Sequence, residues 1–268
     1  KPHSYKFNDD IFRRLATTPK GKNHGFVMFL DWSGSMQNNL KETLKQLFSL
    51  TLFCKQIGVP FEVYAFTDQF MNINKPIQDR CKNDVVISTQ LRLLNILSSR
   101  MNASQFTKAA NALTFVAKTP HHSIPVFTLG GTPLNDTILA AMDIVPEFKR
   151  KNNLQIVNTV ILTDGESNGT ISYCDSSFRE MNARVYYGYG SMRDMVFRDT
   201  ISKHEVKVPH DASTADITAA YIKLLKHRTN SNIIGFYILS LYELKRKLYT
   251  FYPKQYQIYD ELGKNFKK

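Results

Sequence analysis

The sequence predicts an α/β fold with a mostly parallel sheet and helices on both faces. Short, continuous apolar runs rich in strand-forming residues occur at 26–32, 61–67 and 157–163, which is typical of strands buried on both faces. Segments with apolar residues at helical spacing separate these runs. This alternation of strand and helix indicates a doubly wound, Rossmann-like sheet. A chain of 268 residues, 43% of them hydrophobic, can build one such domain with additions.

The first half of the chain begins with a polar, basic stretch, residues 1–24, which we expect to form an arm. The first strand is followed by a helix that starts near Leu40 and is closed by a glycine and a proline. After strand 61–67 the pattern breaks, and residues 85–118 are expected to be mostly helical, with a junction near Asn102.

We expect residues 25–240 to form the domain and residues 241–268 to form a basic, aromatic tail. The stretch "STADITAAYIKLLKHR" is a well-marked helix, with Ser213 or Thr214 as its N-cap and Asp216 in its first turn. The other expected elements of the second half are a helix from about Leu134, the strand 157–163, a strand or loop at 183–190, a hairpin at 194–208 that turns near 201–203, and a buried strand at 232–239.

Charge and cysteine content limit the class of protein. The net charge of +12 favours acidic partners, whether nucleic acid, anionic lipid or an acidic protein. The three cysteines, Cys54, Cys81 and Cys174, are odd in number and widely spaced, which indicates a reducing compartment and buried thiols. We find no apolar run of membrane-spanning length and no secretory signal pattern, so we expect no membrane partner. The chain begins without Met, and we expect it to be an excerpt of a longer protein.

Small oxygen-bearing side chains follow three of the expected elements. Asp31, Ser33 and Ser35 come directly after the first strand, Thr132 lies in a glycine loop, and Asp164 ends the strand 157–163. The carboxyl ends of parallel strands are where ligands bind in open α/β sheets. Carboxylate and hydroxyl oxygens without any soft ligand suit Mg²⁺ or Mn²⁺. The sequence therefore predicts a site for a hard divalent cation.

Glycines stand where this site needs close backbone approach. Gly34 permits a tight bend between the two serines, which lets both hydroxyls face one point. Gly130 and Gly131 would likewise let the loop of Thr132 come near. Asp136, one turn into the next helix, is expected to face solvent.

The stretches "DWSGSM", "GGTPL" and "TDGE" resemble the D-x-S-x-S, T and D elements of the metal-ion-dependent adhesion site of von Willebrand factor A (VWA) domains, in the same order. The resemblance implies that Ser33 and Ser35 bind the metal directly and that Asp31 and Asp164 act mainly through waters. Thr132 would bind directly or through water. It also implies an open position that accepts a Glu or Asp side chain from a protein partner.

The rim of such a site would be formed by Trp32, Gly131 and Glu166. Trp32 has two open interpretations, since its side chain could contact a partner or cover the core. Within the family, "GKNHGFVMFLDWSGSM", "VPFEVYAFT", "GTPLND" and "VILTDGE" are most similar to the CobT-type subunit of cobaltochelatase and its relatives in tailed phages. That branch implies a cytoplasmic protein of a bacterium or a phage-infected cell, working with a MoxR-type AAA+ ATPase.

Other interpretations of the same residues remain open. Asp31, Ser33 and Ser35 could simply cap the following helix. "GESNG" fits the G-x-S-x-G pattern of a hydrolase or peptidase-like enzyme, with Ser167, Asp211 and His227 in the chain order of a triad, although no convincing helix follows it. A phosphatase with Asp31 as nucleophile would need a second carboxylate where Ser33 stands.

The tail 241–268 also has two interpretations. Its aromatic and basic residues could stack on single-stranded nucleic acid, as in a phage virion or scaffold protein. Alternatively, its aromatic side chains pack back on the domain while its lysines face solvent. His204 and His210 lack the spacing of a zinc-binding helix, and His121 and His122 are expected to lie on a loop.

Overall fold

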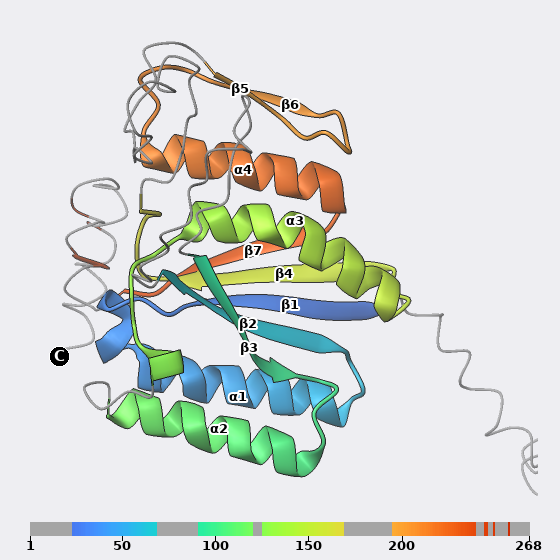
Figure 1. Cartoon of the computed structure of the whole chain (residues 1–268), viewed down its shortest axis with the longest axis vertical. Helices are drawn as coiled ribbons and strands as arrows, with labels where there is room; N and C mark the ends of the chain where they lie inside the picture. The colour runs from blue at the N-terminus through green and yellow to red at the C-terminus, as the bar shows by residue number, and fades with distance from the viewer. Residues whose placement is uncertain are drawn as a thin grey trace, which may run out of the picture.

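The computed structural model describes residues 23–68, 91–119, 125–168 and 195–239, together with 244, 245, 249 and 257. It confirms the α/β fold, with helices on both faces of a central sheet (Figure 1). The strands of this sheet are β1 (His24–Asp31), β2 (Phe61–Asp68), β3 (Leu91–Ser98), β4 (Ile156–Thr163) and β7 (Asn232–Tyr237). The helices are α1 (Leu40–Gln56), α2 (Ala103–Lys118), α3 (Leu134–Lys151) and α4 (Thr214–Thr229), with short 3₁₀ helices at Ser35–Asn38 and Pro125–Phe127.

The order of strands in the sheet is β3-β2-β1-β4-β7. Strands β2, β1, β4 and β7 are parallel, and β3 runs antiparallel to β2. The chain therefore starts in the middle of the sheet, builds one side with β2 and β3, and then builds the other side with β4 and β7. The order reverses between β1 and β4, and in open α/β sheets ligands bind at the carboxyl ends of the strands where such a reversal occurs.

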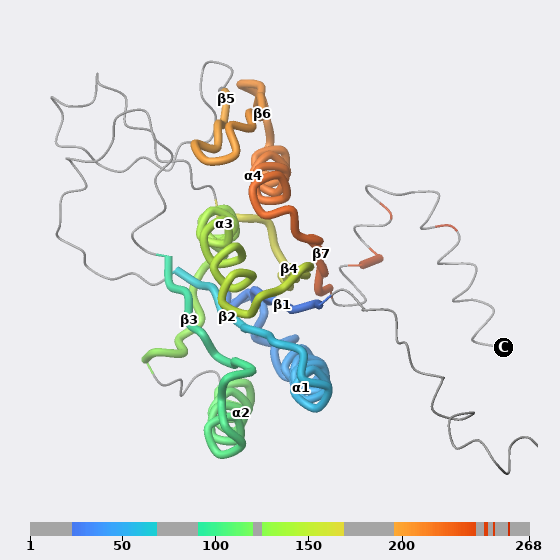
Figure 2. Tube along the Cα trace, turned by 90° about the vertical axis from the view of Figure 1, so that its right-hand side faces the viewer, coloured from blue at the N-terminus to red at the C-terminus, as the bar shows by residue number. Residues whose placement is uncertain are grey.

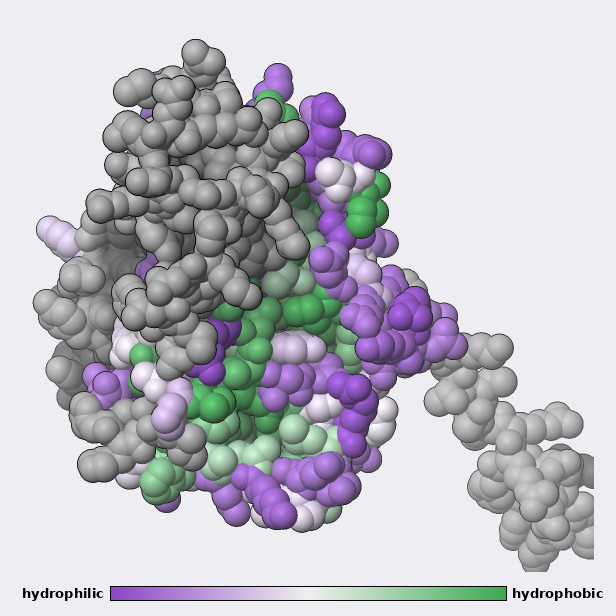
Figure 3. All heavy atoms as spheres, viewed as in Figure 1, coloured by the Kyte–Doolittle hydropathy of each residue, from purple (hydrophilic) through white to green (hydrophobic). Residues whose placement is uncertain are grey.

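Side chains of β1 alternate between two cores. Val27 and Phe29 belong to the core beneath α3 and α4, whereas Met28 and Leu30 belong to the core against α1 and α2. Figure 2 shows the two pairs of helices on opposite sides of the sheet. Hydrophobic side chains gather over the sheet between these helical layers (Figure 3). The continuous apolar run of β1 is thus explained, because both of its faces are buried.

The expected hairpin is confirmed as β5 (Met195–Arg198) and β6 (Glu205–Val208), which pair antiparallel. It packs on α4, where the rings of Phe197 and Tyr221 stack with centroids 4.9 Å apart. Arg228, at the end of α4, forms an ion pair of 3.0 Å with Asp199 in the hairpin turn and another with Asp143 of α3. These contacts fix α4 between the hairpin and the rest of the domain.

Both expected helix starts are confirmed as capping boxes. The Asn102 side chain accepts a hydrogen bond from the Gln105 backbone N–H, and Gln105 binds back to the N–H of Asn102. Ser213 and Asp216 make the same exchange at the start of α4. Each pair satisfies two N–H groups that the first turn of a helix leaves without a partner.

Residues 91–98 form strand β3, so the expectation of a helix across this stretch is wrong. The stretch "LRLLNILS" is rich in leucine, which favours helix by intrinsic propensity. Antiparallel pairing with β2 overrides that preference. The pairing is held by Glu62 of β2, whose buried carboxylate accepts hydrogen bonds from Ser98 (3.0 Å), Asn95 (2.7 Å) and Arg100 (3.0 Å).

The expectation that the last strand is buried is also wrong. β7 lies at the edge of the sheet with β4 as its neighbour, and Ile234, Phe236 and Tyr237 are exposed over 39%, 54% and 44% of their surfaces. Its apolar sequence was typical of a central strand, but its position in the sheet depends on distant segments that a local pattern does not contain.

Several expectations fall outside the described residues. They concern residues 1–22, the stretch 183–190, most of 241–268, His121 and His122, and the thiols of Cys81 and Cys174. Cys54 is a buried free cysteine as expected, and burial raises the pKa of its thiol. Within the described ranges, we find no helix with the length and apolar character needed to cross a membrane.

Replacing Glu62 by Ala should lower the free energy of unfolding by about 1–3 kcal/mol, because Ser98 would lose its buried partner and the β2–β3 pairing would weaken. Urea denaturation followed by circular dichroism measures this. Glu42→Ala is a matched control, since Glu42 is exposed and pairs with Lys45 on the surface of α1. Equal losses in the two variants would contradict the assigned role of Glu62.

Candidate metal centre at the carboxyl edge of the sheet

Asp31 is the last residue of β1, and its side chain is fully buried. One carboxylate oxygen accepts a hydrogen bond of 3.0 Å from the Ser33 backbone N–H. The other accepts a hydrogen bond of 2.7 Å from the hydroxyl of Thr163, the last residue of β4. The carboxylate is therefore fixed between the ends of the two central strands.

A run of hydrogen bonds joins the two serines to the second carboxylate. The hydroxyl oxygens of Ser33 and Ser35 lie 2.9 Å apart, and the Ser35 hydroxyl donates to Asp164 over 2.8 Å. Neither Ser33 nor Ser35 caps a helix, because α1 starts at Leu40 after Asn39 without a side-chain cap, and the short helix at Ser35–Asn38 has none either. The helix-capping interpretation of these residues is wrong.

The loop of Thr132 is held against the turn after β1. The Gly34 N–H donates to the Gly130 carbonyl (2.8 Å), and the Gly130 N–H donates to the Trp32 carbonyl (3.2 Å). The Thr132 side chain is buried, and its hydroxyl oxygen lies 4.0 Å from the position of an ideal Cβ at Gly165. Thr132 is thus placed beside the segment that carries Asp164, and the five predicted site residues share one edge of the sheet.

Asp68 is a residue of this region that the sequence analysis missed. It ends β2, and its carboxylate accepts hydrogen bonds from the Gly131 N–H and from the Asn168 side chain (3.3 Å). Only glycine fits at Gly130, because a Cβ there would lie 1.8 Å from the Asp68 carbonyl oxygen. The signal was present, since Asp68 follows an apolar run just as Asp31 and Asp164 do.

Burial is the main influence on the charge of Asp31. It raises the pKa of this carboxyl from its ordinary 3.8 to about 6, against the lowering effect of the hydrogen bonds from Thr163 and Ser33, and the nearby negative charge of Asp164 raises it further. An ionised carboxylate in this position is therefore short of compensating positive charge. A cation beside it would supply that charge.

The donor set of the site fits a hard cation. It consists of two carboxylates and three hydroxyls, and it contains no sulfur or imidazole. In the parts of the chain that the structure describes, no three His, Cys, Asp or Glu side chains are grouped so that they could hold a metal ion by themselves. Cation binding here would depend on the serine and threonine hydroxyls and on water, a combination suited to Mg²⁺ or Mn²⁺.

The expected rim residues differ in exposure. The Trp32 side chain is fully buried, its indole N–H donates to the Phe127 carbonyl (2.9 Å), and it belongs to the α1-side core. Trp32 therefore covers the core and is not a rim contact. Glu166 is exposed and Gly131 is half-buried. Since Ser35 is exposed and Asp164 half-buried, the cluster opens to solvent on the side of these residues.

Asp136 is fully buried, so the expectation that it faces solvent is wrong. It lies in the first turn of α3 next to Asn135, which is also buried. The Asn135 backbone N–H donates to the Ser167 oxygen (3.0 Å), and Thr218 of α4 donates to the Asn135 side chain (2.7 Å). The start of α3 is thus packed tightly under the site.

The alternative triad of Ser167, Asp211 and His227 is not brought together. Ser167 is buried, and its hydroxyl donates to the Asn168 carbonyl (3.1 Å) while accepting from Asn135. His227 lies in the last turn of α4, where its ring stacks on His204 with centroids 3.7 Å apart. Since α4 leads directly into the amino end of β7, this ring lies at the opposite edge of the sheet.

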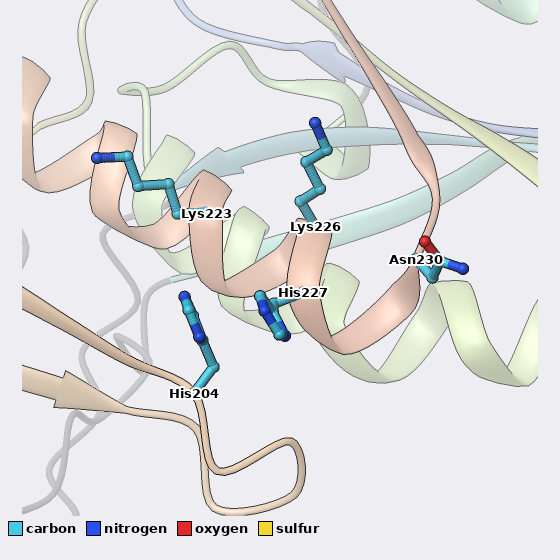
Figure 4. A pocket seen from close by; sticks show the side chains of 5 residues that line it. All are labelled: His204, Lys223, Lys226, His227 and Asn230. Atoms are coloured by element: carbon cyan, nitrogen blue, oxygen red, sulfur yellow. The ribbon is translucent and has the colours of Figure 1, made fainter.

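A pocket with a volume of about 390 Å³ surrounds the stacked histidines. Figure 4 shows the rings of His204 and His227 together, with the amines of Lys223 and Lys226 extending away from each other and Asn230 at the end of the helix. The residues that line this pocket are cationic or neutral, so the pocket suits an anion. It shares no residue with the cluster around Asp31.

No family model matches the chain, and no curated protein matches it. The pilus adhesin SpaC from Lactobacillus rhamnosus GG, in its open conformation, aligns at 17% identity over 81% of this chain with a TM-score of 0.43. A second crystal structure of SpaC aligns at 16% identity over 81% of this chain with a TM-score of 0.39. This chain spans 24% of SpaC in both cases.

The three N-terminal domains of the type V pili tip protein Mfa5 from Porphyromonas gingivalis align at 12% identity and a TM-score of 0.30. This alignment covers 55% of this chain and 20% of the Mfa5 chain. Likenesses this distant carry no argument about function, which has to come from the geometry of the site.

The raised pKa of Asp31 predicts how stability depends on pH in the presence of EDTA. Because the pKa of about 6 in the folded state exceeds the ordinary 3.8, the folded protein binds more protons between these values than the unfolded chain. The free energy of unfolding should therefore fall as the pH rises from about 4 to 6. Above pH 6, the titration of Asp31 should change it no further. The contribution of Asp31 to that fall is about 3 kcal/mol at most.

Urea denaturation of wild type and Asp31→Asn at several pH values between 4 and 7 measures this contribution. The amide does not titrate, so the variant should lose less stability than wild type as the pH rises. Asp211→Asn is the control, because Asp211 is exposed. Parallel pH profiles for wild type and Asp31→Asn would contradict the assignment.

Proposed function

We propose that this chain is a Mg²⁺- or Mn²⁺-dependent protein-binding domain of the VWA type. The observation that carries the proposal is the hydrogen-bonded run from Asp31 through Ser33 and Ser35 to Asp164, at the carboxyl ends of β1 and β4. Thr132 stands beside this run. The same residues match the metal-site pattern of the sequence, and their contacts hold the oxygen atoms of that pattern close together.

Binding is favoured over catalysis by the chemistry of the cluster. A catalytic site would present an activated nucleophile or a base with access to substrate. Here the Asp31 carboxylate is buried and engaged by Thr163 and Ser33, and the exposed groups are the Ser35 hydroxyl and part of Asp164. Neutral hydroxyl ligands leave a bound divalent ion with much of its positive charge, so it can attract a carboxylate from outside.

The partner would offer a Glu or Asp side chain to the ion. The net charge of +12 supports an acidic partner, since the surrounding field attracts it before contact. We propose further that the partner is a MoxR-type AAA+ ATPase, whose work this domain would couple to a substrate. This finer proposal is supported by the similarity of the strand and loop stretches to the CobT-type branch of the family.

Calorimetric titration of Mg²⁺ and of Mn²⁺ into chelator-treated protein tests the metal site. Wild type should bind one ion per chain. Asp31→Ala should abolish saturable binding, because it removes the carboxylate that is held across β1 and β4. Asp211→Ala should bind like wild type, since Asp211 is exposed and remote in sequence from the cluster. Binding that is equal in the two variants would refute the site.

Retention of a MoxR-type ATPase on the immobilised chain tests the coupling role. Retention should require Mg²⁺, should be lost in EDTA, and should fall at least about tenfold in Ser33→Ala, in line with the loss of a charge-assisted contact. Ser49→Ala is the matched control, because that hydroxyl binds the Lys45 carbonyl on the exposed side of α1. An ATPase retained equally with EDTA and by Ser33→Ala would rule out this partner.

A further inference from the structure

Helix α1 carries an exposed apolar stripe in addition to its buried face. Leu50, Phe53 and Ile57 follow one another at the spacing of a helix face, the last of them directly after the end of α1. They are exposed over 37%, 55% and 56% of their surfaces. The buried face of α1 is made by other residues, which include Leu40, Leu44 and Leu47. The stripe is therefore a second apolar face that the described core does not use.

The contacts of Lys55 show which way this stripe points. The Lys55 amine donates to the Ser99 carbonyl (3.4 Å) and to the Met101 carbonyl, in the connection between β3 and α2. That flank of α1 thus faces α2. At 100° per residue, Leu50, Phe53 and Ile57 lie on the opposite flank, which points toward the β7 side of the sheet (Figure 2).

Two exposed side chains of β7 lie on the same side. Ile234 is the register partner of Val160, and Phe236 is the partner of Leu162. Val160 belongs to the core against α1 and α2, and Leu162 packs on it. Paired residues of parallel strands share a face, so Ile234 and Phe236 face the side of α1. They are exposed over 39% and 54% of their surfaces.

These five side chains form what we call the α1–β7 surface: Leu50, Phe53, Ile57, Ile234 and Phe236. On this side of the sheet, the described helices are α1 and α2, and α2 lies toward β2 and β3 (Figure 2). No helix in the described ranges covers β7 there. Large apolar side chains that stay half-exposed on one side of a domain are candidates for a contact surface.

We infer that residues 240–252 of this same chain dock on the α1–β7 surface as an amphipathic helix. The direction in which the chain leaves β7 supports this occupant. Ile238, directly after β7, donates its N–H to the Thr163 carbonyl (2.8 Å) and packs against the core on the α1 side. The segment that follows therefore starts at the margin of the uncovered surface.

The sequence of the segment has the complementary pattern. Leu241, Leu244, Leu248 and Phe251 recur at helical spacing, and Pro253 ends the run. Leu244, Lys245 and Tyr249 are helical, and Leu244 is half-buried while Lys245 and Tyr249 are exposed. The half-burial of Leu244 agrees with a docked helix whose leucine side faces inward.

The dimensions of the two parts also agree. A helix of residues 241–252 is about 18 Å long, and a six-residue strand such as β7 spans about 20 Å. One such helix can cover the exposed side of β7 along its whole length. This inference does not depend on the proposed metal site, since it involves none of its residues.

Tryptic cleavage of the full chain at Lys245, Arg246 and Lys247, followed by mass spectrometry, tests the docking. A docked helix must detach before it is cut, so wild type should be cleaved slowly at these positions. Phe53→Asp and Phe236→Asp should each raise the cleavage rate about tenfold or more. Leu52→Asp is the matched control, because Leu52 is 47% exposed on another side of α1, and its rate should equal that of wild type.

Leu248→Asp changes the docking segment and leaves the described core unchanged. It should also raise the cleavage rate, so the docking can still be tested if Phe53→Asp or Phe236→Asp fails to fold. Equal cleavage rates in wild type, Phe53→Asp, Phe236→Asp and Leu248→Asp would overturn the inference. So would a wild-type dimer, seen by light scattering, that Phe53→Asp dissociates without any change in cleavage rate. In that case a second copy of the chain covers the surface.

Discussion

The buried carboxylate of Asp31 is the group on which the arrangement at the carboxyl edge depends. Its two oxygens accept hydrogen bonds from Ser33 and from Thr163, so one side chain joins the end of β1, the turn after it and the end of β4. Burying a carboxylate is unfavourable unless it is hydrogen-bonded and compensated in charge. The hydrogen bonds are present, but they do not offset the burial, which raises the pKa of this carboxyl to about 6.

The rest of the site lies at the same edge of the sheet. The strand order reverses between β1 and β4, which is where ligands bind in open α/β sheets. Ser33 and Ser35, in the turn after β1, connect by hydrogen bonds to Asp164 after β4. Asp68 draws the loop of Gly131 toward the site from the other side. Contacts between residues as distant as 31 and 163 or 35 and 164 thus bring the oxygen atoms of the site together.

The local sequence pattern was sufficient to predict the central strands β1 and β4, because both faces of each strand are buried and their sequences are continuous apolar runs. It was also sufficient to predict that Asp31, Ser33, Ser35, Thr132 and Asp164 lie at the same edge of the sheet. It failed for β3, where leucine content favours helix but pairing with β2 and the hydrogen bonds of Glu62 decide the structure.

Other failures have the same cause, which is that burial depends on distant segments. The apolar sequence of β7 does not reveal that β7 is an edge strand. Trp32 lies next to the site residues in sequence, yet its indole binds the Phe127 carbonyl, 95 residues away. The position of Asp68 after an apolar run could have been noticed in the sequence, but its contact with the Gly131 loop, more than 60 residues later, could not. No pattern within a short window carries that information.

The charge of the cluster is opposite in sign to the net charge of the chain. The chain as a whole is strongly basic, so its field attracts acidic molecules, but the cluster itself presents the carboxylates of Asp31 and Asp164 and the exposed Glu166 beside them. An acidic side chain would be repelled at close range by these groups alone. Under the proposed function, a bound divalent cation would reverse that sign and would offer the approaching carboxylate a ligand position. Attraction by the whole chain and acceptance at the site would then be separate steps, and only the second would require the metal.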